Sequence, residues 1–310
     1  MRIEITHLTR YRYQPYVKHA QHVAHLTPLQ NAEQKLISHQ LEIVPAPDEN
    51  ETRLDIYGNT RSFFSILSSH DLLTVTASSL VETIPRPPVL SSIVWEAAQQ
   101  RFRYQAHAPY HFATEFIFAS PYVPIHADFL AYALPSFTPS TTLLACAFDL
   151  MSRIHHEFTY AANSTEVHTT ALEAIAQRRG VCQDFAHIMI ACWRAMGLPA
   201  RYVSGYLLTH PPEGQPRLIG ADASHAWASI FVPQLSGDGA IAGSSGYWLD
   251  FDPTNNRNAA QDYVALATGR DFSDVSPLRG VILGGAAHVM DVEVTVTPLE
   301  ASQKTLASYS

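Results

Sequence analysis

The hydrophobic pattern of the chain changes its period at a proline-rich joint, and no other feature constrains the fold as strongly. Before the joint, residues 2–8 alternate polar and apolar side chains, and further short apolar runs bounded by turn residues follow up to residue 77. A period of two residues is typical of strands. Three prolines within residues 85–88 then stop any regular element. Beyond them, residues 142–158 place apolar side chains at helical spacing.

This change of period predicts an α+β protein in four parts. We expect an N-terminal antiparallel β domain at residues 1–85, a proline-rich linker at 86–94, a core of helices and strands at 95–275 and a C-terminal strand segment at 276–310. The run Tyr-Gly-Asn-Thr at 57–60 predicts a hairpin tip, because Gly and Asn adopt the positive φ that tight turns need. How the C-terminal strand docks is left open.

Composition excludes several classes of protein. The 310 residues are 46% hydrophobic and 15% charged, which is typical of a folded chain. The net charge of −8 and the lack of a long Lys/Arg run argue against nucleic acid as the main partner. The sequence has three cysteines, an odd number, and no Cys-x-x-Cys motif, so we expect free thiols in a reducing compartment. The sequence shows no apolar leader and no apolar stretch of about 20 residues, which predicts a soluble cytoplasmic protein without a membrane partner.

One predicted helix carries the residue with the clearest chemistry. The run Gly-Val-Cys-Gln-Asp-Phe at 180–185 opens a helix that continues to Met196, and Gly-Leu-Pro ends it. Cys182 therefore stands at a helix N-terminus, where unpaired N–H groups and the helix dipole favour a thiolate. We expect Gly180 to allow tight approach by a substrate.

A base and an orienting acid stand on two later strands. His225 opens a strand at 225–232, and Asp252 closes a strand at 247–252. A hairpin between them makes the strands antiparallel, so that the two side chains lie on the same side of the sheet. We expect the helix of Cys182 to pack across that side and complete a Cys182–His225–Asp252 triad.

Such a triad performs acyl transfer. The thiolate attacks a carbonyl, His225 protonates the leaving amine, and Asp252 fixes the imidazole tautomer and supports its charge. The N–H of Cys182 is a candidate donor to the oxyanion, and the second donor stays open.

Four motifs in this order resemble the bacterial transglutaminase-like superfamily. They are the run at 180–187, Gly-Leu-Pro-Ala-Arg-Tyr-Val-Ser-Gly-Tyr at 197–206, Ala-Ser-His-Ala-Trp at 223–227 and Trp-Leu-Asp-Phe-Asp-Pro-Thr at 248–254. Tyr-Arg-Tyr at 11–13, Asp-Ile-Tyr-Gly-Asn at 55–59 and Ser-His-Asp-Leu at 69–72 resemble the N-terminal β region that accompanies this core. Gly-Arg-Asp-Phe-Ser-Asp-Val-Ser-Pro at 269–277 resembles its C-terminal signature.

The resemblance implies a papain-like α+β core, in which a helix carrying the Cys packs on an antiparallel sheet carrying the His and Asp. It also implies Cys182 as nucleophile, His225 as base and Asp252 as orienting acid. The family often has Glu where this chain has Ser229, so one contact outside the triad differs. Bacterial members are often regarded as peptidases or amidases, not protein cross-linkers.

The leading interpretation is hydrolysis of a peptide or isopeptide bond through a thioester at Cys182, with a protein or peptide substrate as the partner. Transfer of a Gln γ-acyl group to an amine is an alternative, which differs in what resolves the thioester. A non-catalytic binding scaffold is another, because a fold alone does not fix a function. An arylamine-type acyltransferase shares the triad logic but not the Asp-Pro-Thr and Gly-Arg-Asp signatures. The oligomeric state stays open.

Other residues receive smaller roles. We expect no cofactor and no metal, since His155-His156-Glu157 lacks a third ligand at a suitable spacing. Candidates for supporting the triad or lining the substrate are Gln183, Asp184, Tyr202, Trp227 and Trp248, with packing as the alternative for the Tyr and both Trp. We expect packed positions for Cys146 and Cys192, a core or supporting position for His187, and surface positions for His19, His22, His25 and His39. Thr169 is a predicted helix N-cap, and residues 237–246 are a predicted flexible hairpin loop.

Overall fold

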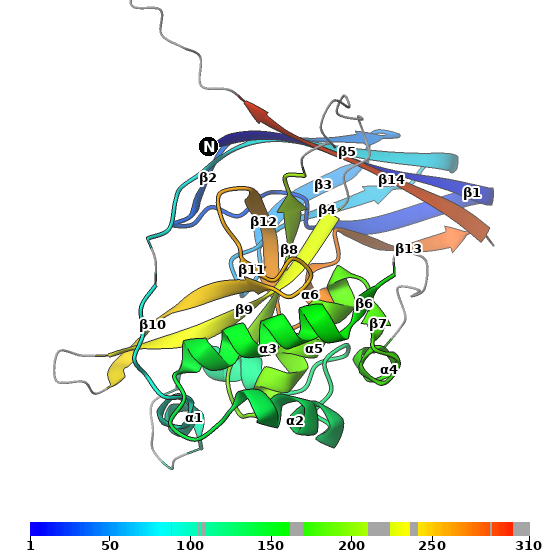
Figure 1. Ribbon diagram of the computed structural model, residues 1–310. Coiled ribbons are helices and arrows are strands. Elements are labelled where there is room, and N and C mark those ends of the chain that lie inside the picture. The colour runs from blue at the N-terminus through cyan, green and yellow to red at the C-terminus, as the bar shows by residue number, and fades with distance from the viewer. Residues whose placement is uncertain are drawn as a thin grey trace, which may run out of the picture.

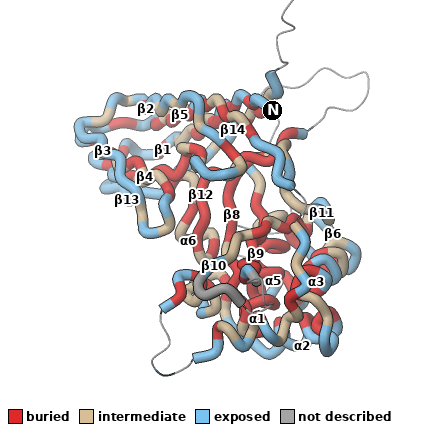
Figure 2. The backbone as a smooth tube through the Cα atoms, turned by 90° about the vertical axis from the view of Figure 1, so that its left-hand side faces the viewer, coloured by how far each residue is buried: buried red, intermediate tan, exposed pale blue. Residues whose placement is uncertain are grey.

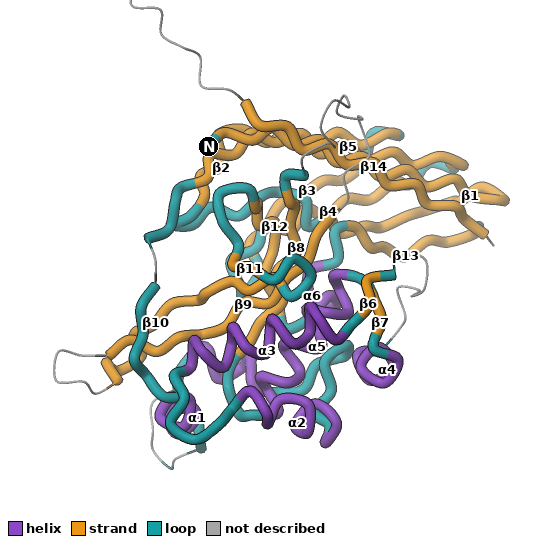
Figure 3. Tube along the Cα trace, in the orientation of Figure 1, coloured by secondary structure: helices purple, strands orange, loops and turns teal. Residues whose placement is uncertain are grey.

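The computed structural model is built in three layers: an N-terminal sheet, a second sheet beneath it, and a layer of helices beneath that (Figure 1). It describes residues 1–87, 89–104, 106, 110–161, 170–209, 224–235, 241–285 and 287–299. Strands occupy one end of the molecule and helices the other (Figure 3). The second sheet therefore lies between the N-terminal sheet and the helices, and the fold is the expected α+β type.

The N-terminal sheet is organised around one long strand. Alternate residues of this strand from Ile3 to Thr9 are buried, as its period-two pattern predicts. The strands of the sheet are β1 (Arg2–Ala24), β2 (Gln34–Val44), β3 (Glu49–Leu54), β4 (Thr60–Ile66), β5 (His70–Thr83), β13 (Leu278–Gly284) and β14 (Ala287–Leu299). The first part of β1 pairs with β5 and β14, and its second part pairs with β4 and β13. The C-terminal strands thus dock on β1 and belong to the N-terminal sheet.

The second sheet is antiparallel, with the strand order β11-β10-β9-β8-β12. Its strands are β8 (Ala200–Leu207), β9 (Ser224–Leu235), β10 (Ile241–Asp252), β11 (Arg257–Asn258) and β12 (Tyr263–Gly269). Residues 241–246 belong to β10 and not to a loop as predicted, because Ile241 pairs with Leu235 and Gly246 with Pro233. Residues 237–240 of the predicted loop lie outside the described residues.

One central helix, α5 (Cys182–Ala195), joins the helical layer to the second sheet. It is buried from Asp184 to Arg194 and contacts β9 and β8. Figure 2 shows buried backbone running through β8 and β12 to the helices. The remaining elements are α1 (Trp95–Phe102), η1 (Phe112–Ile117), α2 (Ala127–Ala133), η2 (Leu134–Ser136), α3 (Leu143–Glu157), β6 (Thr159–Tyr160), α4 (Ala171–Gln177), β7 (Arg179–Gly180) and α6 (Phe272–Val275). Of the helices in the described ranges, none has the length and apolar character that a membrane crossing requires.

Helix α4 begins one residue later than its predicted cap implies. The Thr170 hydroxyl accepts the Glu173 N–H at 3.2 Å, and the Glu173 carboxylate accepts the Thr170 N–H at 2.8 Å. This reciprocal pair is a capping box. The cap is therefore Thr170, whereas the predicted cap, Thr169, lies outside the described residues.

Two histidines expected at the surface are buried. His22 stacks on Phe64 with ring centroids 5.1 Å apart, and His25 bonds the Ser276 carbonyl oxygen at 3.0 Å. Both are nearly inaccessible to solvent. The prediction was wrong because β1 continues to Ala24, and its pleat turns His22 inward.

Two side-chain amides of the N-terminal region bind the backbone of β12, an edge strand of the second sheet. Gln34 donates to the Ala265 carbonyl and accepts the Ala265 N–H, both at 2.8 Å. Asn59 makes the same pair of bonds with Thr268, also at 2.8 Å. An edge strand has backbone groups without strand partners, and these amides satisfy them. They fix the N-terminal sheet on the second sheet.

Candidate active site

The candidate nucleophile opens the central helix. Cys182 is the first residue of α5, is partly accessible and carries a free thiol. The Asp184 carboxylate accepts the Val181 N–H at 2.8 Å and so closes the first turn. A Cβ on Gly180 would lie 2.6 Å from that carboxylate. Gly180 is therefore needed to make room for Asp184, which is a different reason from the substrate access that we expected.

The structure brings His225 and Asp252 together at one end of the second sheet. His225 lies near the start of β9, and Asp252 is the last residue of the neighbouring β10. The His225 Nε2–H donates to Asp252 Oδ2 at 2.7 Å. Nδ1 is then the ring nitrogen left for the Cys182 thiol, which also hydrogen-bonds the His225 side chain.

Asp252 is fully buried and held as a carboxylate by several donors. Besides His225, the Tyr263 hydroxyl and the Asn255 amide each donate to Oδ2 at 2.7 Å, and the Thr254 N–H donates to Oδ1 at 2.8 Å. Burial alone favours the neutral acid, but these bonds and the positive charge of His225 outweigh it and lower the pKa of Asp252. The site therefore holds a fixed negative charge behind the imidazole.

This carboxylate determines the charge of His225. Burial disfavours the imidazolium, but hydrogen bonds to Asp252 and Cys182 outweigh it and raise the pKa of His225 to about 9. Trp227 and Tyr263 flank the ring, with centroids 6.0 and 6.1 Å away. At neutral pH the arrangement therefore favours a protonated imidazole beside the thiol.

Helix α5 covers the face of the sheet opposite to the one that carries His225. Ala226 and Ala228 share the main apolar core with α5, whereas Trp227 between them lies in a separate cluster. The prediction that this helix packs across the His225 side is therefore wrong. The small alanines admit a helix, while the bulky Trp227 fills the other face. Cys182 meets His225 at the sheet end because it is the first residue of the helix.

The structure separates the five supporting candidates. Tyr202 is buried on the α5 side of the sheet, where burial and the Cys182 charge raise its pKa well above the ordinary value. Asp184 and Gln183 lie in the first turn beside Cys182, and Trp227 lies under His225. Trp248 is instead part of a cluster with Phe231 and Phe102, away from this end of β10.

Three residues near the triad were not predicted. Asn255 donates to Asp252 and follows it by three residues, in the turn that begins with Asp-Pro-Thr. This short separation in sequence was a signal that could have predicted the contact. Tyr263 reaches Asp252 from β12, and no sequence pattern indicates this contact. Tyr160 pairs with Gly180, two residues before Cys182, in the two-stranded β6–β7 sheet and is about half exposed.

His187 and the Gly-Arg-Asp signature form a structural connection behind the site. His187 is buried, and its Nε2 accepts the Phe272 N–H at 3.2 Å. Asp271 caps α6 by accepting the Ser273 N–H at 2.9 Å. Arg270 donates to both oxygens of Asp274 at 2.9 and 3.0 Å. The motif therefore anchors the end of β12 to α5.

The histidine pair considered for metal binding is bonded to backbone. Nδ1 of His155 donates to the Thr254 carbonyl at 3.0 Å, and Nδ1 of His156 donates to the Ser152 carbonyl at 2.7 Å. Within the described ranges, no group of three or more His, Cys, Asp or Glu side chains has an arrangement that could hold a metal ion.

Two separate segments of the chain match known sequence families. Residues 3–82 match the bacterial transglutaminase-like N-terminal region, and residues 133–253 match the transglutaminase-like superfamily. An uncharacterised protein of Mycobacterium tuberculosis is 42% identical over 305 residues, which cover 96% of this chain and 93% of that protein. One from Mycobacterium leprae is 33% identical over 304 residues, which cover 96% of this chain and 99% of that protein.

A solved structure shows the same fold. A candidate cysteine protease from Cytophaga hutchinsonii superimposes with a TM-score of 0.70 and 22% identity, covering 97% of this chain and 92% of that one. The two family matches follow the same order as the N-terminal sheet and the core that carries Cys182, His225 and Asp252. The chain therefore belongs to the transglutaminase-like superfamily, with the bacterial N-terminal region of that superfamily ahead of its core.

Proposed function

We propose that the protein is a thiol-dependent enzyme that hydrolyses peptide or isopeptide bonds through a thioester at Cys182. The observation that supports this most directly is the hydrogen-bonded chain from Asp252 through His225 to Cys182. Membership of the superfamily supports the same class of chemistry. The substrate is a protein or peptide that presents its carbonyl carbon to the thiol.

The reaction begins from a thiolate and a protonated imidazole. The sulfur of Cys182 bonds to the carbonyl carbon, and the carbonyl electron pair moves onto oxygen. When this intermediate collapses, the C–N bond breaks and the Nδ1 proton of His225 goes to the leaving nitrogen. A water molecule then gives a proton to neutral His225, and the oxygen of that water bonds to the acyl carbon. The C–S bond then breaks and the acid product is released. The Cys182 thiolate and the His225 imidazolium are thereby restored.

The remaining roles follow from position. Asp252 keeps the imidazole oriented and compensates its charge throughout the cycle. The Cys182 N–H belongs to the first residue of α5 and has no intrahelical acceptor, so we assign it as an oxyanion donor. Tyr160, half exposed beside Gly180, is assigned as a wall for the substrate.

The test compares the wild type with Cys182→Ala on a fluorogenic peptide pool. We expect the variant to lose at least about a thousandfold in kcat/KM, because the nucleophile is absent. Cys146→Ala is the matched control, since this thiol is fully buried in the core and should leave turnover within about threefold. Circular dichroism checks that both variants fold. Full turnover by Cys182→Ala would exclude the thioester.

A second measurement separates hydrolysis from transfer. Acyl-enzyme is formed with an activated ester, and a primary amine is added at increasing concentration. Hydrolysis predicts that free acid remains the main product, with mass spectrometry showing the acyl group on Cys182. Product that shifts to the amide at low amine concentration would make transamidation the activity. No acylation, together with slow and equal alkylation of all three thiols, would favour a binding scaffold.

A further inference from the structure

A second polar group lies on the same sheet face as His225. Arg201 of β8, Ser229 of β9 and Asp250 of β10 are paired directly across three strands, and we call them the Arg201 row. Along β9 the row is four residues from His225, which corresponds to about 13 Å. Trp227 stands between the two groups on this face. The row is therefore separate from the triad.

The guanidinium of Arg201 has unused hydrogen-bonding capacity. It lies over the Trp248 ring, 4.3 Å from the centroid, and its Nε–H is buried without an acceptor in the described part of the chain. Asp250 and Glu33 act on it only through space, and Glu33 is already paired with Arg86. Burial lowers the pKa of Arg201 to about 10, which still leaves it charged at neutral pH.

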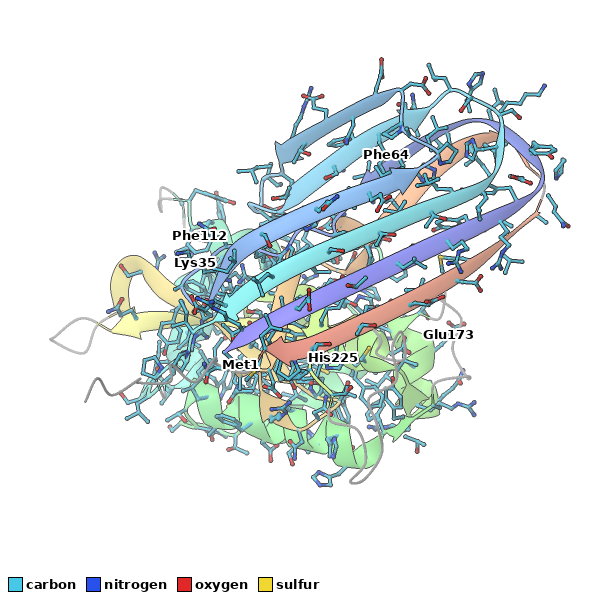
Figure 4. All side chains as sticks on the ribbon, turned by 90° about the horizontal axis from the view of Figure 1, so that it is seen from above. Met1, Lys35, Phe64, Phe112, Glu173 and His225 are labelled. Carbon is cyan, nitrogen blue, oxygen red and sulfur yellow. The ribbon has the colours of Figure 1, made fainter. Side chains whose placement is uncertain are left out.

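Arg201 lines a hollow of about 410 Å³ with aromatic walls. The Phe116 ring is 5.2 Å from Trp248 and 5.4 Å from Tyr57, and Phe112 is half exposed at the same hollow. Figure 4 shows Phe112 at the edge of the molecule, apart from His225. The hollow has the size of a small-molecule site and combines apolar walls with one charged donor group.

We propose that this hollow binds a carboxylate carried on an aromatic group, such as the C-terminal aromatic residue of a peptide. A carboxylate matches the fork of an arginine and compensates its charge, whereas a neutral acceptor would leave that charge buried and unpaired. The rings of Phe112, Phe116 and Trp248 offer edge and face contacts to an aromatic group. Of the described residues that line the hollow, Glu115 alone carries a carboxylate, and it accepts the Tyr57 hydroxyl at 2.7 Å.

Three probes test the proposal on the whole protein by isothermal titration calorimetry. N-acetyl-L-phenylalanine has the ring and the carboxylate, N-acetyl-L-phenylalaninamide lacks the carboxylate, and acetate lacks the ring. We expect the first to bind at least about tenfold more tightly than the other two, because it alone satisfies both parts of the hollow. Equal affinity of the acid and its amide, or no binding at millimolar concentration, would overturn the proposal.

Variants locate the binding. Arg201→Gln should weaken N-acetyl-L-phenylalanine at least about tenfold, and Phe112→Ala should weaken it several-fold without disturbing the core, since Phe112 is half exposed. The control is Arg53→Gln, an exposed arginine paired with Glu51 on β3, which should change nothing. If Arg201→Gln does not fold, the Phe112→Ala variant and the comparison of the three probes still test the proposal.

Binding at the hollow does not depend on the chemistry at Cys182. The Cys182→Ala variant should therefore retain the affinity for N-acetyl-L-phenylalanine. Loss of binding in that variant would place the probe in the catalytic cleft and overturn the assignment to Arg201. Inactivity of the wild-type enzyme on peptides would leave the binding measurement unaffected.

Discussion

The His225–Asp252 pair and the Arg201 row lie on one face of one sheet, yet their hydrogen-bonding groups are satisfied to different degrees. Asp252 is fully buried, and every oxygen of its carboxylate accepts at least one hydrogen bond. The Ser229 hydroxyl in the Arg201 row is equally buried but has no partner among the described residues. Asp252 and Ser229 are buried to the same extent, and they differ in the supply of partners.

This contrast agrees with the different roles that we propose for the two places. A charge that supports a reaction benefits from donors that are in place before the substrate arrives, because no reorganisation is then needed. A group that recognises a ligand gains by leaving donors unused until the ligand supplies an acceptor. If these roles hold, substitutions in the two places should differ in their effects, from a large loss of activity at Asp252 to almost no change at Ser229.

Replacing the carboxylate of Asp252 should have the largest effect on activity. Asp252→Asn presents an amide to His225, which no longer fixes the productive tautomer or compensates the imidazolium. We expect kcat/KM to fall about 10²- to 10⁴-fold on the fluorogenic peptides. The folded content is checked by circular dichroism. A loss of less than threefold would mean that Asp252 does not support the reaction.

The charge on His225 predicts the alkaline limit. The raised pKa of about 9 means that the imidazolium is present below that value and lost above it, so kcat/KM should fall as pH rises through about 9. Folded stability follows the same sign: this contribution is complete below the ordinary pKa of about 6.5 and is lost as pH rises through about 9. Urea unfolding between pH 6 and 10 measures it, and a His225→Gln variant should lack this dependence.

Deleting the Tyr263 hydroxyl, which donates to Asp252, should lower the stability of the fold. Tyr263→Phe removes one donor from the Asp252 carboxylate, and we expect the free energy of unfolding to fall by about 1–3 kcal/mol. With one donor fewer, the pKa of Asp252 rises, so the acid limb of activity should move to higher pH. Urea unfolding and a pH–rate profile check the two effects. An unchanged profile would reduce Tyr263 to a packing residue.

Deleting the hydroxyl from the Arg201 row should cost least. Ser229→Ala removes a buried hydroxyl that has no partner in the described part of the chain, so the free energy of unfolding should stay within about 0.5 kcal/mol or increase. The same urea experiment compares it directly with Tyr263→Phe. If Ser229→Ala and Tyr263→Phe lowered the free energy of unfolding equally, the proposed difference between the surroundings of Asp252 and the Arg201 row would be wrong.

The sequence was sufficient to predict the pair but not its surroundings. Period-two patterning and the hairpin between the two runs predict two adjacent antiparallel strands, and in the observed register His225 and Asp252 face the same side. Tyr263 arrives from β12, which lies beside β8 in the sheet and not beside β10. That strand order depends on packing between distant segments, which local patterns do not encode.

The side of the sheet that α5 covers was mispredicted for a related reason. Both faces of β9 are rich in apolar residues, and the pattern alone does not say which face receives the helix. Ala226 and Ala228 decide it, because small side chains allow a helix to approach closely. Likewise, the inward turn of His22 depends on how far β1 extends, and element ends are the least predictable part of a sequence.

The pairing of β1 with β14 has a consequence for the order of assembly. Arg2 is the partner of Leu299, and Ile3 of Pro298, so β1 finds these neighbours only after β14 has been synthesised, nearly 300 residues later. Contacts between such distant residues form slowly, since a long loop must close first. During translation, the strand edge that β14 later covers is open to other chains. One edge of β1 is thus covered long after the strand itself has been synthesised.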